Sequence, residues 1–186
     1  MTNDDLFNLV RQIVLTVTGV PEAIEANQNA PAPAGDYATV WVKPNRQQRG
    51  QAIIRHSSTD LVTSPIGQVH DVNHDIRPQV IGQVSVNFFR GSAHSYAAQL
   101  FEANKRPDVS ELLFNAGVGW KQTGPVNDLT ALQSNQNEPR AEITLSLMFE
   151  QTQNVTSNAI YSATINAEDG GGNQLQSETK TAPVGV

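Results

Sequence analysis

The sequence predicts an α+β fold, in which an antiparallel β-sheet is packed by an N-terminal helix and a central helix, with long loops and a flexible C-terminal arm. Three observations predict this class. An apolar stripe with helical spacing opens the chain, two later segments alternate apolar and polar residues, and the last connections are short enough for hairpins. Helices that are separate from antiparallel strands are typical of α+β proteins. We expect one domain over residues 1–167 and an arm over residues 168–186.

The first element is an amphipathic helix over about residues 4–18. Thr2 and Asp5 form a capping-box-like start, and Gly19 followed by Pro21 stops the helix. The apolar side chains recur on one stripe that faces a core: Leu6, Leu9, Val10, Ile13, Val14 and Val17.

The connector over residues 27–36 contains Pro31 and Pro33, which have no backbone N–H to donate, so we expect an extended segment. We expect it to pack against a neighbouring subunit or along its own sheet. Strands are predicted over residues 37–42 and 51–56, with an exposed loop over residues 43–50 between them. Residues 57–75 show no period and predict a long loop or flap.

The middle of the chain predicts a long half-buried strand over residues 76–90, because apolar and polar residues alternate there. Ser92 then caps a helix, Pro107 and Asp108 begin a second short turn, and Gly117 supplies its C-terminal stop. A strand with Trp120 is predicted over residues 118–123.

The last third of the chain predicts more strands. An edge strand is expected over residues 128–132, and residues 140–151 alternate most regularly of all. A weaker alternation covers residues 158–166. After Glu168, three consecutive glycines and a polar sequence without period predict the flexible arm, which a partner would order.

The composition excludes several classes. The 186 residues include 16 asparagines and 16 glutamines, which together outnumber the 12 basic and 18 acidic residues. The net charge of −6 argues against binding of nucleic-acid phosphates, which needs a basic surface. The absence of cysteine excludes disulfides and thiolate chemistry. The acidic N-terminus is no signal peptide and no apolar run could span a bilayer, so we expect a soluble, cytoplasmically made protein without a membrane partner.

Histidines offer the main candidates for chemistry. His70, His74 and Asp75 could ligate a metal if they lay on one helix, but the segment precedes a strand, so a solvated hairpin tip is favoured. His94 beside Ser92 indicates the polar start of a helix rather than a nucleophile pair. No nucleophile elbow, phosphate-binding loop or dinucleotide motif occurs. We therefore expect no enzyme, no cofactor and no metal.

Two alternative classes stay open. Trp41 and Trp120 could stack on a sugar in a carbohydrate- or ligand-binding β-module, although a core or interface role is favoured. A metal-dependent hydrolase would use the histidine cluster just described. Glu142 and Glu150 are too far apart to form an acid–base pair, and the glycosylation sequon at Asn154 is attributed to chance.

Several segments carry a resemblance to a known family. The helix over residues 6–17 with its stop at residues 18–21, and the connector over residues 27–33 before Tyr37, resemble the opening of the phage neck terminator (tail terminator) family. The sequence of residues 87–91 before a helix, and residues 126–132 followed by residues 139–141, are similar to the same family. The specificity lies in the order and spacing of these segments over residues 4–150.

The resemblance implies a structural virion protein. Such proteins form a ring, typically of six copies, at the head-proximal end of a long phage tail, where they stop tube polymerisation and join the tail to the head. The implied partners are further copies of the chain, the tail tube protein, the head-side connector or stopper protein and the tail sheath. DNA would pass through the ring without specific binding. The protein would be assembled in the host bacterial cytoplasm and end in the virion neck. Another neck or head–tail completion protein is the alternative.

Candidate interface residues follow from the resemblance and from the predicted loops. They lie in the connector, at the start of the following strand, in the basic loop, in the edge strand and at the start of the last long strand: Asn27, Gln28, Asn29, Pro31, Pro33, Tyr37, Lys43, Arg46, Arg49, Asp128 and Arg140.

Overall fold

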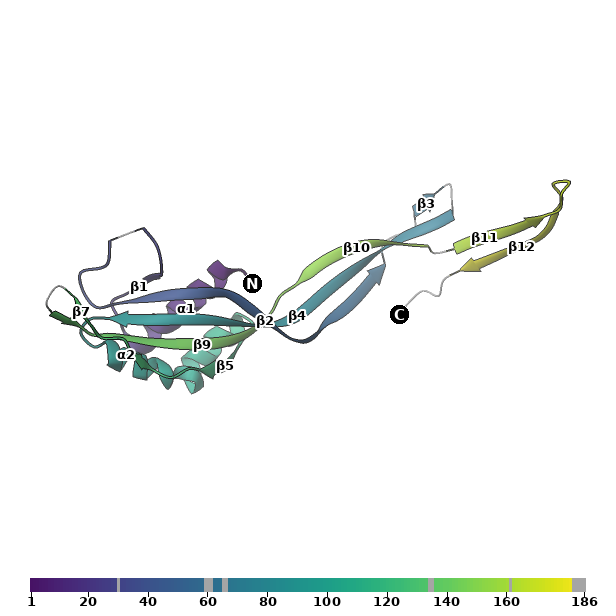
Figure 1. Cartoon of the computed structure of the whole chain (residues 1–186). Coiled ribbons are helices and arrows are strands. Elements are labelled where there is room, and N and C mark those ends of the chain that lie inside the picture. Colours follow the sequence, from purple (N-terminus) through teal and green to yellow (C-terminus); the bar gives the residue numbers. More distant parts are fainter. Residues whose placement is uncertain (30, 59–61, 65–66, 134–135, 161, 182–186) are drawn as a thin grey trace. The chain divides into compact units, whose positions relative to one another are not determined.

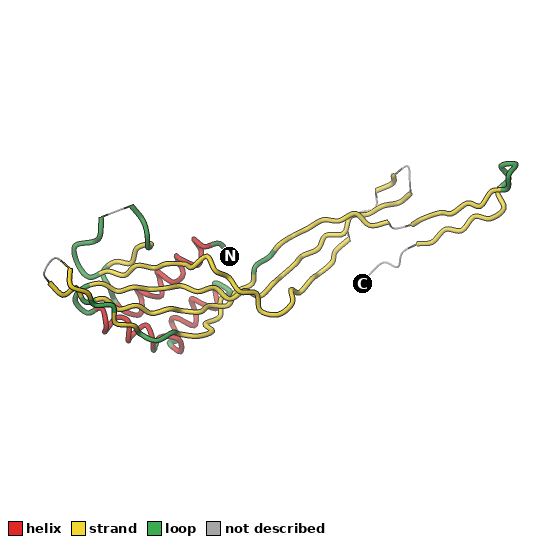
Figure 2. The backbone as a smooth tube through the Cα atoms, in the orientation of Figure 1, coloured by secondary structure: helices red, strands yellow, loops and turns green. Residues whose placement is uncertain are grey.

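A computed structural model describes residues 1–29, 31–58, 62–64, 67–133, 136–160 and 162–181. The chain divides into two compact units. Unit 1 comprises Met1–Gln51 and Pro78–Gln151, and unit 2 comprises Ala52–Arg77 and Thr152–Val186. All the described helices belong to unit 1, whereas the regular structure of unit 2 consists of strands (Figures 1 and 2).

Helix α1 (Asn3–Thr18) confirms the first sequence prediction. Its capping box is formed by Thr2 and Asp5, and it ends at Gly19, whose φ of 67° lies in the left-handed region that glycine adopts without strain. The predicted apolar stripe is buried along its whole length. The helix therefore packs one face on the core and leaves its polar face in water.

The main sheet orders its strands β1 (Glu22–Glu25), β2 (Tyr37–Ser58), β4 (Gly67–Phe89), β9 (Arg140–Glu150) and β5 (Val118–Thr123). β1 pairs in parallel with the start of β2, and β9 pairs antiparallel with both β4 and β5. The two-residue strand β6 (Asn127–Asp128) also pairs with β9. This mostly antiparallel sheet with separate helices confirms the predicted α+β class.

The core lies between one face of this sheet and the helices. Alternate residues of β9 are buried from Ala141 to Phe149, and Val84, Val86 and Phe88 of β4 are fully buried beside them. α1, α2 (Ala93–Phe101) and α3 (Pro107–Asn115) supply the other side of this core. Burying each large apolar side chain contributes about 1.5–3 kcal/mol, so this layer dominates the stability of unit 1.

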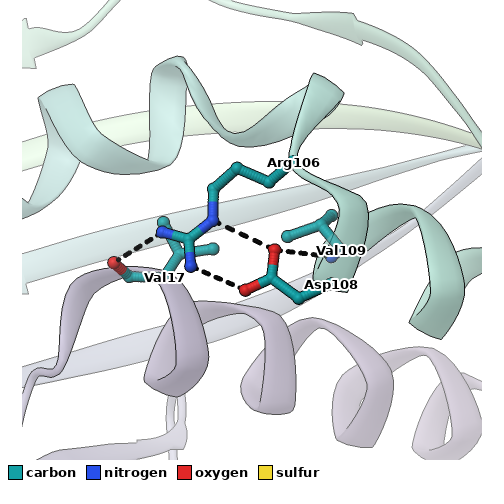
Figure 3. Close-up of polar contacts among 4 residues, drawn as sticks. All are labelled: Val17, Arg106, Asp108 and Val109. Atoms are coloured by element: carbon teal, nitrogen blue, oxygen red, sulfur yellow. Dashed lines mark hydrogen bonds and ion pairs between the residues drawn. The ribbon is translucent and has the colours of Figure 1, made fainter.

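Arg106 connects two of the helices (Figure 3). It lies between the short 3₁₀-helix η1 (Ala103–Lys105) and α3, and its Nη1 donates to the carbonyl oxygen of Val17 at 3.4 Å. Its other nitrogens bind both carboxylate oxygens of Asp108, at 3.1 and 2.6 Å. A cation at the last turn of α1 also interacts favourably with the helix dipole. The fork therefore fixes the start of α3 against the end of α1.

Unit 2 contains the first half of β4, which pairs antiparallel with β10 (Gln153–Ile160) and with β3 (Val62–Ser64). A separate hairpin joins β11 (Ser162–Glu168) to β12 (Gln174–Thr181). Its turn is organised by Asp169, whose Oδ1 accepts from the backbone N–H groups of Gly171 and Asn173 at 2.9 and 2.8 Å. Unit 1 holds the other small hairpin, between β7 (Ala131–Gln133) and β8 (Gln136–Glu138).

Several sequence predictions are corrected here. The expected loop over residues 43–50 lies inside β2, and much of the expected flap over residues 57–75 belongs to β2, β3 and β4, while residues 59–61 and 65–66 of that flap lie outside the described residues. The single strand expected over residues 158–166 falls into β10 and β11. Among the described side chains of these segments none is buried, so burial of one face imposes no regular alternation of apolar and polar residues there.

The end of the chain forms regular structure, although its sequence predicts a flexible arm. The segment over residues 168–186 contains strand β12, while the domain boundary at residue 167 stays a prediction. Within the described ranges, no helix is long and apolar enough to cross a membrane.

Candidate functional site

The face of the main sheet that points away from the helices carries polar and aromatic side chains. Strand alternation places Thr39 and Trp41 of β2, Ser85 and Asn87 of β4, and Glu142 of β9 on this open face. Trp41 is 42 % exposed although it lies within a strand. A large exposed aromatic side chain of this kind is typical of a contact surface.

A group of polar and aromatic contacts surrounds Arg90, which directly follows β4. Its Nε binds Glu138 Oε1 at 3.1 Å, and its guanidinium carbon lies 5.5 Å from the centre of the Tyr37 ring. Tyr37 stacks on Phe89 with ring centres 4.6 Å apart and planes 4° apart. Burial raises the pKa of the Tyr37 phenol, so this hydroxyl stays neutral. We call Arg90, Tyr37, Phe89, Glu138 and Arg140 the Arg90 cluster.

Arg140 occupies the neighbouring position on β9. Its Nη2 donates to Asn87 Oδ1 at 3.0 Å, and its guanidinium carbon lies 4.9 Å from the Phe89 ring centre. Its Nε is buried and has no hydrogen-bond partner among the described residues. Arg140 borders a depression of about 420 Å³ on the open face, with polar and aromatic walls that include Asn27, Trp41 and Glu142. The depression is therefore lined by hydrogen-bonding and aromatic side chains.

The connector is held at both ends, because Ala26 N–H donates to the carbonyl oxygen of Val40 at 3.0 Å just before it and Arg90 binds its second half. Arg90 Nη1 donates to the carbonyl oxygens of Pro33 and Gly35. Tyr37, the residue that follows the connector, stacks on Phe89. Towards the other end the side chains are exposed, and Asn27 has a φ of 65°. Gln28, Asn29 and Pro31 are thus accessible for contact with another chain.

The three basic candidate residues of β2, Lys43, Arg46 and Arg49, do not form one patch. Arg46 lies towards the helices, where Nη2 donates to Asn3 Oδ1 at 2.5 Å and the guanidinium carbon lies 5.2 Å from the Phe149 ring centre. Lys43 lies 5.9 Å from the ring centre of Trp41, and Arg49 Nη1 donates to Met148 Sδ at 3.4 Å. Because the segment is a strand and not a loop, alternation separates Arg46 from the other two.

Asp128 lies close to the Arg90 cluster in the sheet, where it pairs with Ala141. Its Oδ1 accepts from the backbone N–H of Thr130 at 2.8 Å and lies 3.4 Å from His94 Nε2. The hydrogen bonds from Thr130 lower the pKa of Asp128, with a smaller contribution from His94. Asp128 therefore stays charged and exposed at this end of unit 1.

Sequence reasoning missed Arg90 and Glu138. Arg90 has a φ of 66°, which is uncommon outside glycine and marks a constrained position. The signal that could have found it is the Arg90-Gly91 step between a predicted strand and a predicted helix, where the chain has to turn sharply.

The histidines do not assemble a metal site in the described structure. His74 Nδ1 lies 2.8 Å from His56 Nδ1, and His74 Nε2 lies 2.6 Å from Ser157 Oγ. Asp75 instead binds Arg77 at 2.6 Å. The side chain of His70 lies outside the described residues, and no group of three metal-ligating side chains occurs among the described ones.

A direct sequence comparison identifies the family of the chain. The family model described as phage neck terminator protein matches residues 4–173, which is most of the chain. The chain belongs to the phage neck terminator family. Comparison with curated protein sequences gives no match.

Membership identifies this neck terminator as a structural protein of the bacteriophage head–tail junction, and therefore as a virion component. The family is structural and not normally enzymatic. The match extends beyond the segments that carry the resemblance in the sequence, because it includes β10 and β11.

Proposed function

We propose that this neck terminator assembles as a ring of about six copies at the head-proximal end of the phage tail. The ring stops polymerisation of the tail tube and joins the tail to the head-side connector or stopper protein. Family membership over residues 4–173 is the observation that carries this proposal. DNA passes through the ring without specific binding, which suits a chain with a net charge of −6.

The surface of the chain supports a role in protein assembly. Charged residues make up only 16 % of the sequence, and interface cores are depleted of charge. The candidate contacts to unlike partners are the accessible connector residues Gln28, Asn29 and Pro31 and the C-terminal hairpin β11–β12. The tail tube, the head-side connector and the tail sheath are the partners that these surfaces would meet in a neck assembled in the host cytoplasm.

The test is to add the purified protein to growing tail tubes and to measure tube length and end structure by electron microscopy. The proposal predicts shorter tubes, each capped at one end by a ring. Unchanged tube length with uncapped ends would contradict it.

A second candidate function, glycan binding, is favoured by one observation. Trp41 is 42 % exposed beside the polar depression, whereas Trp120 is half-buried and donates from Nε1 to Thr123 Oγ1 at 2.9 Å. Titration with glycans distinguishes the two functions. Glycan binding would change the fluorescence of the wild-type protein and leave that of Trp41→Phe unchanged, and the ring predicts no response from either.

A further inference from the structure

The described side chains of unit 2 form no buried core. Among the side chains described in this unit none is buried, and Ile53, Ile54 and Val155 are 53 %, 51 % and 41 % exposed. A sheet of few strands is stable in water only when it has an apolar face to pack. Within the part of unit 2 that the structure describes, no such packed face is seen, and a neighbouring chain could supply it.

Three strands of unit 2 form a bonded ribbon, made of residues 52–58 of β2, residues 69–76 of β4 and β10. Side-chain bonds cross it. His56 Nδ1 lies 2.8 Å from His74 Nδ1, and His74 Nε2 lies 2.6 Å from Ser157 Oγ. Thr156 Oγ1 donates to Asn73 Oδ1 at 2.8 Å. These bonds fix the register of the three strands, so the ribbon presents defined edges.

The same contacts assign the two faces of the ribbon. His56, His74 and Ser157 share one face, and alternation adds Ile54 and Val155 to it. None of these residues is an acid, a lysine or an arginine.

The other face carries charge. Asp75 binds Arg77 at 2.6 Å, and the pKa of Asp75 is lowered first by this bond and also by the charge of Arg55. The two faces of the ribbon thus differ in charge. The face to which a newly introduced side chain points is therefore known.

Both outer edges of the ribbon are unpaired among the described residues. β10 pairs only with β4, and β1 covers β2 only from Tyr37 to Val40. Natural sheet edges are usually protected by charged residues, proline or bulges. The sequence from Gln151 to Ala167 contains no charged residue and no proline. An edge without such protection is suited to pairing with another strand.

We infer that the free β2 edge of the ribbon pairs with the free β10 edge of the next copy of this chain, so that one sheet continues from subunit to subunit. The inference rests on the proposed ring and names the contact that closes it. The two edges match in length, since Ala52–Ser58 and β10 are seven and eight residues long. Each therefore spans about 23–26 Å.

The direction of the strands fits a ring. β2 and β4 run in opposite directions in Figure 1, and β10 is antiparallel to β4, so β2 and β10 run the same way. Pairing one kind of edge with a different kind is a heterologous contact, which repeats around a rotation axis until it closes. Pairing two β10 edges would instead give a dimer and leave both β2 edges unused.

The test uses engineered cysteines, because the chain has none of its own. Ile54→Cys is combined with Gln153→Cys or with Val155→Cys, which lie on the same face of the ribbon. Assembly is first measured by light scattering, and the thiols are then joined by a short bis-maleimide that tolerates a difference in register. The expected result is a ladder on a denaturing gel that extends to the mass of the ring.

A matched control places the first cysteine on the opposite face, as Ile53→Cys with Val155→Cys, and is expected to give no ladder. Assembled rings without a cross-link in either same-face pair would overturn the edge pairing and leave the ring standing. Dimers from Val155→Cys alone would show β10–β10 pairing and overturn it too. If the wild-type chain forms no ring even with tube protein, the proposed function fails together with this inference.

Discussion

Arg90 and Glu138 form an ion pair with 3.1 Å between Nε and Oε1, although 48 residues separate them in the chain. The same guanidinium group binds the carbonyl oxygens of Pro33 and Gly35. One side chain thus holds the connector, the end of β4 and strand β8 together. The candidate interface residues Gln28, Asn29 and Pro31 lie just before this contact in the connector. Arg90 therefore positions the surface that we propose for partner contact.

Replacing Arg90 by alanine removes these bonds and leaves the two carbonyl oxygens without their donor. We expect the free energy of unfolding to fall by about 1–2 kcal/mol, because hydrogen bonds to a charged group contribute about 1.5–3 kcal/mol and the partial exposure of Arg90 reduces this. Urea denaturation followed by circular dichroism measures the loss. Lys105→Ala, at an exposed position, is the control and should leave the midpoint unchanged. Equal midpoints for both variants would show that Arg90 holds nothing in place.

Gly91 lies against the carboxylate of Asp36, with a φ of 30°, so a Cβ at this position would collide with that carboxylate. Gly91→Ala should therefore lower the thermal midpoint, at a cost of about 1–2 kcal/mol. Gly35→Ala is the matched control, because its Cβ would meet open space. In the double variant with Asp36→Ala, part of the loss should be recovered. Additive losses would show that the collision is not the cause.

The Arg106–Asp108 pair predicts a dependence of stability on pH. Hydrogen bonds from Arg106 lower the pKa of Asp108 below its ordinary value of 3.8. The unfolded chain therefore takes up this proton more readily than the folded one. The contribution is complete above the unfolded pKa and is lost as pH falls through the folded pKa, so it disappears on acidification below about pH 4.

Urea midpoints at pH 7 and pH 3 for the wild type and for Asp108→Asn measure this contribution. The variant should be less stable at pH 7 and should lose less on acidification. Other aspartates with lowered pKa values, Asp5 and Asp169 among them, titrate in both proteins and cancel in the comparison. The same loss in both proteins would exclude Asp108 as a source of the pH dependence.

Val155→Lys tests the importance of the β10 edge without cysteine chemistry. A lysine there replaces an exposed apolar side chain by a charge, which is the usual protection of a sheet edge. We expect each subunit contact to weaken about tenfold, equivalent to about 1.4 kcal/mol. Sedimentation velocity should then show monomers at concentrations where the wild type is a ring. Thr152→Lys, just outside β10, is the control. If both variants assemble like the wild type, the edge is not an interface.

The C-terminal hairpin is predicted to serve a junction along the tail axis. β11 and β12 pair only with one another among the described residues, so ending the chain at Ile160 removes them without opening another paired strand. Truncated rings should still form but should bind tail tubes or filled heads more weakly. Pull-down with each partner measures this. Failure to form rings at all would place the hairpin in the ring interface.

The sequence predicts those elements that have one buried face. α1, β9 and the second half of β4 all show a regular period, because every second or every third to fourth residue enters the core. The segment from Lys43 to Gly50 was expected to be a loop because it contains proline and glycine. It continues as a strand, and Gly50 takes a φ of 69° within it.

Unit 2 could not be predicted in the same way. None of the described side chains of its ribbon is buried, so no regular pattern of apolar residues indicates which residues pair. Of the candidate interface residues, Tyr37, Pro33 and Arg140 lie around one cluster, and their role in an interface stays a prediction. Arg90 was missed because its partners come from segments far apart in the chain, and only the fold brings them within reach of one side chain.

Assembly into a ring is tested best by measuring the mass of the protein. Light scattering coupled to size-exclusion chromatography gives the mass of the purified protein, alone and mixed with its tail tube protein. The proposed ring predicts a closed species of about six times the 20.1 kDa chain, in one or both conditions. A mass of one chain in both conditions would contradict it.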